Sequence, residues 1–99
     1  MSLISERRQQ REIEERNRLR ALLEEADFKA VISSPAGRRF VRRVLGECGV
    51  HRTTYHESAA LAAFLEGKRA VGLWLQSLFA EYPGFYILLL QEGVKDDAD

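Results

Sequence analysis

Residues 33–72 constrain the fold most, because they contain a helix start, a helix stop, a loop and a second helix in that order. Proline disfavours the helical region for the residue before it and suits the first position of a helix, so Ser34 is the predicted N-cap and Pro35 the first helical residue. Gly49 is placed to end this helix in the left-handed conformation. Between these signals, five apolar residues share one helical face: Phe40, Val41, Val44, Leu45 and Cys48.

The second half of this segment predicts a loop and a long helix. Residues 51–57 combine polar and β-branched side chains without a helical stripe, and a helix is expected over about residues 59–82. Apolar residues occupy more than one face of this helix, so we expect it to be the central, mostly surrounded helix, with Trp74 as a core anchor. Gly67 and Gly72 predict close crossings by another helix, because glycine destabilises a helix interior.

The N-terminal segment, residues 1–26, is charged and contains neither Gly nor Pro, and good helix formers dominate it. Its apolar residues are sparse until a one-sided stripe begins with Leu19, Leu22, Leu23 and Ala26. The first four turns therefore have almost nothing to bury. We expect a solvated helical arm, frayed when alone and stabilised only by a partner.

The C-terminal part predicts one more short helix. The stretch Phe85 to Gln91 is rich in leucine, follows Pro83, and would have no second strand to pair with if it were extended. Residues 93–99 are polar and acidic, which predicts a disordered tail. The expected fold is all-α: a compact domain of three or four helices over residues 27–92, with the helical arm before it and the acidic tail after it.

Charge is distributed unevenly along the 99 residues, although the formal net charge is zero. Residues 1–52 contain twelve Lys/Arg and eight Asp/Glu, a net charge of +4, and residues 53–99 contain three and seven, a net charge of −4. Such a dipole favours head-to-tail association of copies. It argues against a dedicated nucleic-acid binder, because those proteins usually carry a net basic charge.

No segment suggests export or membrane insertion. The first ten residues lack the apolar centre of a signal peptide, and the longest apolar run, Ile87 to Leu90, is far shorter than the ~20 residues that cross a bilayer. Cys48 is the single cysteine, so no intrachain disulfide can form and a reducing compartment is the simpler interpretation. We expect a cytosolic or assembly-incorporated protein without a membrane-spanning segment.

A dense basic surface is predicted opposite the apolar stripe of the helix after Pro35, from four arginines: Arg38, Arg39, Arg42 and Arg43. This surface would bind phosphates or an acidic protein. The alternative is a solvated face whose arginines pair with Glu47 and residues 24–27, and we favour it because basic helix faces are ordinary on soluble domains. Further candidate partner contacts are Tyr55 on the loop and Arg7 and Arg11 on the arm.

Cys48, His51 and His56 have the spacing C-x₂-H-x₄-H, which raises a zinc hypothesis with Glu57 as a fourth ligand. Structural zinc sites usually bring two paired-ligand motifs, so we favour Cys48 as a small core residue instead. A Cys–His nucleophile pair would lack an orienting side chain and an oxyanion loop, and no nucleotide-binding glycine motif occurs. The sequence thus predicts no catalytic residue, no metal and no cofactor.

Two motifs resemble those of a family of small helical proteins encoded by tailed phages and typified by a protein of a Bordetella podophage. In that family a TPEGRRFL…LLEECGV helix is followed by a variable loop and an NEGRRNVGLWL helix. The matching residues are Ser34-Pro35, Arg38-Arg39-Phe40, Cys48-Gly49-Val50, Glu66-Gly67-Lys68-Arg69 and Val71-Gly72-Leu73-Trp74-Leu75. The resemblance covers about residues 27–92, and Ala36 and Leu65 depart from the common Glu and Asn.

The resemblance implies a component of the phage particle or of its assembly, and it supplies no catalytic residues. With the exposed arm, it leads us to expect a non-enzymatic structural protein, present in multiple copies in the virion as an internal (ejection) or head-to-tail component. Its expected partners are other virion proteins and further copies of itself, assembled in the bacterial host cytoplasm. The alternative is a small regulatory phage protein that binds nucleic acid or a host protein through the arginine surface.

Overall fold

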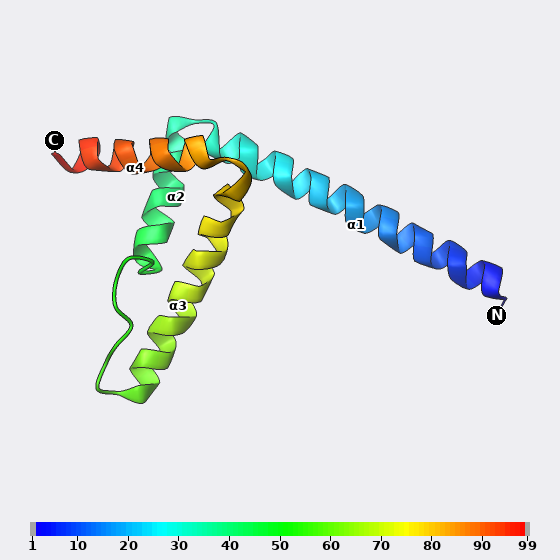
Figure 1. Ribbon diagram of the computed structural model, residues 1–99, viewed down its shortest axis with the longest axis horizontal. Coiled ribbons are helices and arrows are strands. Elements are labelled where there is room, and N and C mark those ends of the chain that lie inside the picture. The colour runs from blue at the N-terminus through cyan, green and yellow to red at the C-terminus, as the bar shows by residue number, and fades with distance from the viewer. Residues whose placement is uncertain (1, 99) are drawn as a thin grey trace. The chain divides into compact units, whose positions relative to one another are not determined.

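The computed structural model describes residues 2–98, which form helices and connecting turns without a strand. The all-α prediction is therefore confirmed. The elements are α1 (Leu3–Ile32), α2 (Pro35–Glu47), α3 (Ala59–Ser77), the 3₁₀ helix η1 (Leu78–Glu81) and α4 (Pro83–Ala98) (Figure 1). The chain divides into two compact units, the first ending at Ala30 and the second beginning at Val31. The helix that contains the predicted arm therefore continues beyond residue 26.

The first unit is a single helix, the part of α1 that ends at Ala30. Every described residue before Phe28 is exposed. Ser2 begins the helix, because its Oγ accepts the N–H of Ser5 at 3.2 Å. Arg18 lies 2.6 Å from Glu15 in an exposed pair, and solvent screens most of the attraction in such pairs. The apolar stripe that starts at Leu19 therefore lies in solvent within this unit.

Both predicted end signals of α2 are confirmed. The Oγ of Ser34 accepts the N–H of Gly37 at 2.9 Å, and Pro35 is the first helical residue. A side chain on Gly37 would collide with the carbonyl oxygen of Val31, so this turn requires glycine. Gly49 has a φ of 70°, the left-handed conformation predicted for the end of the helix.

The packed face of α2 differs from the predicted stripe. Arg38, Val41 and Leu45 are buried, whereas Phe40 is 61% exposed. The spacing i, i+3, i+7 of the three buried residues defines a stripe as regular as the one through Phe40. The aliphatic stem of Arg38 covers apolar surface once its charged end has partners, which is why this stripe is the one that packs.

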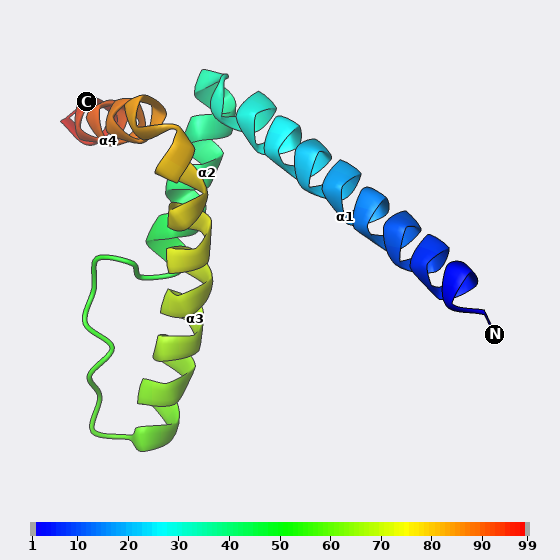
Figure 2. The same ribbon diagram turned by 45° about the vertical axis from the view of Figure 1, so that its right-hand side comes forward.

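The core of the second unit is small, and no buried apolar side chain in it comes from α3. Its buried apolar side chains are Ile32, Val41, Leu45, Val50, Phe79 and Leu89. Within this unit α2 and α3 lie side by side, and α4 crosses next to α2 (Figure 2). Three helices of this length bury only a narrow strip of each.

The prediction that α3 is surrounded is wrong. Of its residues only Gly72 is buried, and Trp74 is 61% exposed rather than a core anchor. A close approach at Gly72 is confirmed, since a Cβ there would lie 2.5 Å from Cγ2 of Val50, but the segment that approaches is the turn after α2 rather than a helix. The approach predicted at Gly67 is wrong, since a Cβ there would meet nothing within 4 Å. The domain has too few elements to cover more than one side of this helix.

The last helix begins at Pro83 as predicted but runs to Ala98, so the prediction of a disordered tail is wrong for residues 93–98. Residue 99 lies outside the described residues. The acidic composition had suggested disorder, yet Asp96 pairs with Arg42 of α2 at 2.6 Å. Gly93 is buried where that arginine crosses. Within the described range, no helix is long and apolar enough to span a bilayer.

Candidate functional site

The four arginines of α2 lie in two environments and do not form the single basic surface that was predicted. Arg38 is buried and Arg42 is half-buried, whereas Arg39 and Arg43 are exposed. The prediction that all four lie opposite the packed face is wrong. Residues at i and i+4 share a helical face, so Arg38 and Arg42 lie together on the side of α2 that meets α4.

Arg38 directs its donors to groups inside the protomer. Its Nε and Nη2 donate to the carboxylate of Glu92, with Nη2 2.8 Å from Oε1. Its Nη1 donates to the carbonyl oxygen of Ile32 at 2.9 Å, and its Cζ lies 5.9 Å from the ring centre of Phe85. A guanidinium in this fork geometry forms some of the strongest pairs that proteins contain. The side chain therefore connects α2, α4 and the last residue of α1.

The hydrogen bond from Arg38 lowers the pKa of Glu92 below its ordinary value, and the charges of Arg38 and Arg42 act in the same direction. Partial burial of the carboxylate and the nearby Asp96 oppose this shift without reversing it. The Arg38 side chain is 7% exposed and that of Glu92 27% exposed. A phosphate could reach this guanidinium only by breaking the pair, so Arg38 belongs to the framework of the fold.

Arg42 makes a second, more exposed link to α4. Its Nη2 donates to Oδ2 of Asp96 at 2.6 Å, and its Nη1 lies 3.4 Å from the carbonyl oxygen of Leu89. A Cβ on Gly93 would lie 2.7 Å from Cδ of this arginine. The close passage therefore depends on glycine at a position where sequence reasoning had placed the start of a disordered tail.

The remaining predicted contact residues of the second unit are exposed. Arg39 and Arg43 lie on the outer face of α2, and Tyr55 on the loop before α3 is 79% exposed. The N–H of Tyr55 donates to Oγ1 of Thr53 at 3.1 Å, which bends the loop locally. Whether these three side chains contact a partner stays a prediction.

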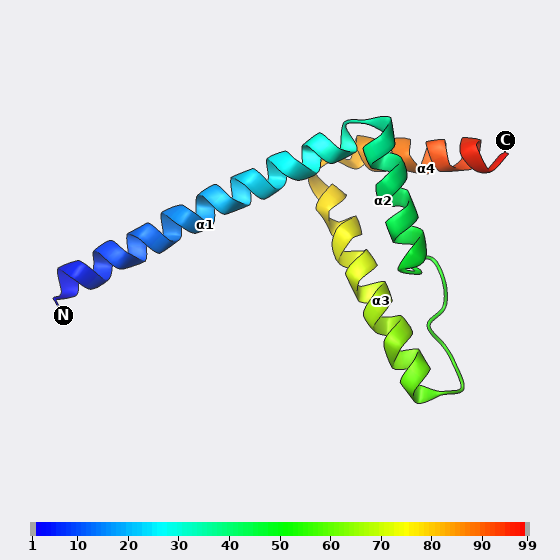
Figure 3. The same ribbon diagram turned by 180° about the vertical axis from the view of Figure 1, so that it is seen from behind.

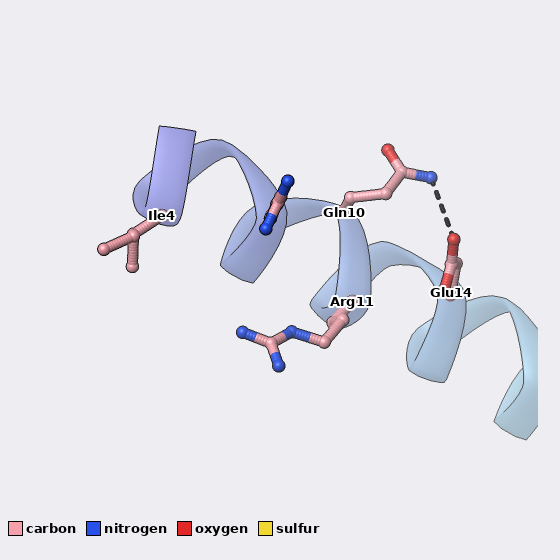
Figure 4. A pocket seen from close by; sticks show the side chains of 5 residues that line it. Ile4, Gln10, Arg11 and Glu14 are labelled. Carbon is pink, nitrogen blue, oxygen red and sulfur yellow. Dashed lines mark hydrogen bonds between the residues drawn. The ribbon is translucent and has the colours of Figure 1, made fainter. Parts of the chain in front are cut away.

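The predicted arm residues Arg7 and Arg11 line a shallow depression on α1 together with Ile4, Gln10 and Glu14 (Figure 4). Gln10 donates to Glu14 at 3.2 Å, and all five residues are exposed. They belong to one helix, so no second wall excludes water from the depression. It suits contact with another protein surface better than capture of a small molecule.

Cys48, His51 and His56 are not brought together as a ligand set. Among residues 2–98, no group of three or more His, Cys, Asp or Glu side chains is placed to hold a metal ion. Cys48 is half-buried against Gly72, in agreement with the small core role favoured for it. His51 is exposed, and Nδ1 of His56 accepts the N–H of Ser58 at 3.0 Å, so His56 helps to begin α3.

Sequence reasoning missed an exposed apolar surface on α3 by assigning its residues to the core. Phe64 is 60% exposed, Val71 57% and Trp74 61%. Four small exposed residues lie between them at helical spacing, and we call the whole set the α3 face: Ala60, Ala63, Phe64, Gly67, Ala70, Val71 and Trp74. The available signal was an excess of apolar residues over what so short a chain can bury.

A second apolar stripe lies exposed on α4. Ile87, Leu90 and Val94 follow the spacing i, i+3, i+7 and are 54%, 43% and 73% exposed. Their spacing places them opposite Leu89 and Gly93, the residues of α4 that pack in the core. Two of the three helices in this unit therefore present apolar residues to solvent.

A family model described as a Bbp19-like phage protein matches residues 28–91. The resemblance inferred over about residues 27–92 is thereby confirmed. No curated protein and no solved structure matches the chain. Several residues of the two motifs have architectural positions here, because Gly37, Gly49 and Gly72 permit a turn, a helix end and close packing of the turn after α2 on α3.

Proposed function

The chain belongs to the Bbp19-like phage protein family, and we propose that it is a non-enzymatic structural component of the phage particle. In this proposal several copies act among the internal (ejection) proteins or at the head-to-tail junction, and the protein works by binding other proteins. One observation carries the proposal: a large share of the apolar surface remains unburied within the protomer. Such surfaces on small proteins usually mark interaction sites.

The arm supports a binding role. On α1 the side chains of Leu19, Leu22 and Leu23 are 53%, 52% and 63% exposed. A single amphipathic helix gains most of its stability from packing its apolar face against something else. The stripe lies in the C-terminal part of the 30-residue α1, and this part of the helix is suited to lie in an apolar groove of a partner.

The second unit supports the same role through the α3 face and the stripe on α4. Its core contains only six buried apolar side chains among the described residues, while Phe40, Phe64 and Trp74 each remain about 60% exposed. Burial of aromatic side chains dominates the energetics of protein interfaces. Association with neighbours in a particle would bury this surface.

The opposite net charges of the two halves of the chain support head-to-tail assembly less than the sequence suggested. The +4 and −4 halves meet inside the protomer, where Arg38 and Arg42 of the first half pair with Glu92 and Asp96 of the second. Residues 1–30 contain seven Lys/Arg and seven Asp/Glu, and residues 31–99 contain eight of each, so both units are formally neutral. Apolar contact, rather than head-to-tail attraction of charges, is the favoured route to assembly.

The regulatory alternative, in which the arginine surface binds nucleic acid, has weaker support. Two of its four arginines are engaged with carboxylates of α4, which leaves Arg39 and Arg43 exposed on α2. Phosphate binding depends steeply on the number of cations that meet the backbone. Two exposed arginines on a neutral unit provide a weak electrostatic site.

Quantitative proteomics of purified particles tests the proposal. We expect this protein at a fixed ratio to the portal protein through successive density-gradient steps, because a structural component remains with the particle. Host ribosomal proteins serve as a control for contaminants that decline with each step. Abundance in infected-cell lysate together with loss from purified particles would contradict a structural role. Retention on nucleic acid at low salt that disappears at high salt would then favour the regulatory alternative.

A further inference from the structure

Around α3, apolar side chains face solvent, which is the opposite of the distribution expected for a protein that acts as a monomer. The seven residues of the α3 face are all apolar or glycine, and all are exposed. The charged residues of α3 flank this face: Lys68 and Arg69 are half-buried, with Nζ of Lys68 5.7 Å from the ring centre of Phe64, and Glu66 accepts a hydrogen bond from Thr54 of the loop. A solvent-facing helix surface ordinarily contains the charges and hides the apolar residues.

Nothing in the second unit covers this face. In Figure 3 α2 and the loop that follows it lie on the same side of α3, and no other helix of residues 31–98 lies along the opposite side. Gly72, the residue that packs on Val50 and Cys48, is on the covered side. Helical spacing places Gly67 away from it, which agrees with the open space around Gly67.

The residues of the α3 face repeat with a period of seven. Ala60, Gly67 and Trp74 form one row, Ala63 and Ala70 a second, and Phe64 and Val71 a third. A seven-residue repeat is typical of a surface that packs along another helix, because 3.5 residues per turn keep the same residues in contact with the partner. The face therefore fits a helix better than it fits a loop or a flat sheet.

We propose that the occupant of the α3 face is α3 of a second copy of this chain, antiparallel to the first and related to it by a two-fold axis at Gly67. This arrangement places residue i opposite residue 134 − i of the partner. Ala60 then faces Trp74, Ala63 faces Val71, Phe64 faces Ala70, and Gly67 faces its own counterpart. Each of the three large side chains meets an alanine, as a self-complementary isologous interface requires.

The size pattern distinguishes this pairing from the parallel one. In a parallel pair at the same register, Trp74 would meet Trp74 and Phe64 would meet Phe64, while alanines would face alanines across a gap. Large side chains opposed to large ones hold the helix axes apart, and the gaps between small residues would forfeit packing. The antiparallel pair interleaves large and small residues along its whole length.

The dimer explains why position 67 is occupied by glycine. Glycine is the least favourable residue in a helix interior apart from proline, and no atom of the protomer requires its small size. At the centre of a two-fold crossing, a missing side chain lets two helices approach closely. The seven residues of the face are uncharged, with Lys68 beside them over the ring of Phe64, and a surface with so little charge disfavours a strongly acidic or basic partner.

The area fits a moderate dimer. Phe64 and Trp74 each expose on the order of 100–150 Å² of side-chain surface, since a fully buried aromatic residue loses about 150–250 Å². With Val71 and the small residues, the face offers about 400 Å² per copy, roughly half of a standard protein interface. We therefore expect a weak, concentration-dependent dimer that assembles further through α1 and α4.

Light scattering combined with size-exclusion chromatography tests the dimer on the full-length chain, with Gly67→Gln as the disrupting variant. The new side chain has open space in the protomer and a better helix propensity than glycine, so the fold is retained, while the helix crossing is obstructed. We expect a dissociation constant at least about tenfold weaker than that of the parent chain. Gly46→Gln is the matched control, because Gly46 of α2 is also exposed, helical and open, yet lies off the α3 face.

Two results would overturn the proposal: a parent chain that stays monomeric at the highest soluble concentration, or equal dissociation constants for Gly67→Gln and Gly46→Gln. The second result would arise if copies associated through the arm or through the stripe on α4. Circular dichroism of each variant confirms that helix content is unchanged.

Cysteine cross-linking tests the orientation in a Cys48→Ala background. The double variant Ala63→Cys/Val71→Cys should form disulfide-linked dimers, because the two positions face each other between copies. Neither single variant should cross-link with itself, since identical positions lie about 12 Å apart along the helix axes and a disulfide needs Cα atoms within about 7 Å. Self-cross-linking of Ala63→Cys would indicate a parallel pair, and failure of the double variant to cross-link would exclude the antiparallel one.

This inference deepens the proposed function by naming one of the surfaces through which copies assemble, and the two can fail separately. Loss of the protein from purified particles, with dimerisation sensitive to Gly67→Gln, would overturn the structural role and leave the dimer intact. Stoichiometric incorporation into particles, with no effect of Gly67→Gln on the dimer, would support the structural role and overturn the proposed dimer.

Discussion

Two helix faces in the second unit can be compared directly: the face of α2 that meets α4, and the face of α3 that meets solvent. The first contains the guanidinium of Arg38, buried and bound to Glu92. The second contains Phe64 and Trp74, both about 60% exposed. Charge is buried and aromatic surface is exposed, the reverse of the arrangement found in most small soluble domains.

The difference separates what holds the protomer together from what is left for association. The α2–α4 contact uses hydrogen-bonded ion pairs, whose geometry specifies how two short helices cross even where the net gain in stability is small. The apolar residues that a larger domain would bury remain outside. A domain organised this way completes its packing only when other molecules cover its exposed apolar residues. Four predictions test the comparison of the two faces, from the largest expected effect to the smallest.

Replacing Arg38 should have the largest effect. Arg38→Met keeps most of the aliphatic stem but leaves Glu92 and the carbonyl oxygen of Ile32 without their donor. We expect a loss of about 2–3 kcal/mol in the free energy of unfolding, below the cost of breaking a fully buried pair because Glu92 is partly exposed. Urea denaturation measures it. Arg39→Met is the control, and equal losses for the two variants would show that the buried pair has no structural role.

The two glycines of α3 should respond in opposite directions to the same change. Gly72→Ala places a Cβ 2.5 Å from Cγ2 of Val50, and we expect about 1–3 kcal/mol of destabilisation from overpacking. Gly67→Ala meets open space and should stabilise the isolated protomer by up to about 1 kcal/mol through helix propensity. Thermal denaturation at low protein concentration compares them. Destabilisation by both would mean that the two sides of α3 are not as different as their burial suggests.

Acid should weaken the α2–α4 face and leave the α3 face unaffected. The folded-state pKa of Glu92 is lowered by Arg38, so its contribution to stability is complete above the unfolded pKa of about 4.3 and is lost as pH falls through the folded value. Glu92→Gln should therefore be less stable than the parent at neutral pH, and the difference should shrink below about pH 4. Urea denaturation from neutral to acidic pH measures it. In the Arg38→Met background, Glu92→Gln should change the pH dependence of stability little, because the partner of Glu92 is already absent. If Glu92→Gln has the same effect with and without Arg38, a group other than Arg38 lowers the pKa of Glu92.

Local signals made most helix boundaries predictable. Ser34, Gly49 and Pro83 each act on their own turn of backbone, so their effects could be derived without tertiary contacts. The choice of packed face could not be derived in this way. On α2 the stripes through Phe40 and through Arg38 are both regular, and the second is the one that packs because of a carboxylate 54 residues away on α4.

Long-range pairing explains one of the two other failures, and the small size of the unit explains the second. Residues 93–98 are acidic, and they are helical here in contact with Arg42, a partner that composition alone could not assign to them. On α3 the apolar residues outnumber the positions that a three-helix unit can cover, and the sequence does not indicate that the excess stays outside. Predicted contacts at Arg39, Arg43, Tyr55, Arg7 and Arg11 still await a test with partners.

The smallest effect is expected at Arg42, the exposed end of the α2–α4 face. Arg42→Gln removes the pair with Asp96, whose side chain is 51% exposed, so solvent and salt already screen most of the attraction. We expect a loss of about 0.5–1 kcal/mol at low ionic strength that falls further as salt is added. Arg43→Gln, one residue along on the exposed side, is the matched control and should change stability by less than about 0.5 kcal/mol. Amide hydrogen exchange adds a local readout: the last turn of α4 should lose protection in Arg42→Gln alone, because Asp96 then loses its ion pair with α2. Equal exchange in both variants would mean that the end of α4 is helical for reasons of its own, and the ionic character of this face would then be confined to Arg38 and Glu92.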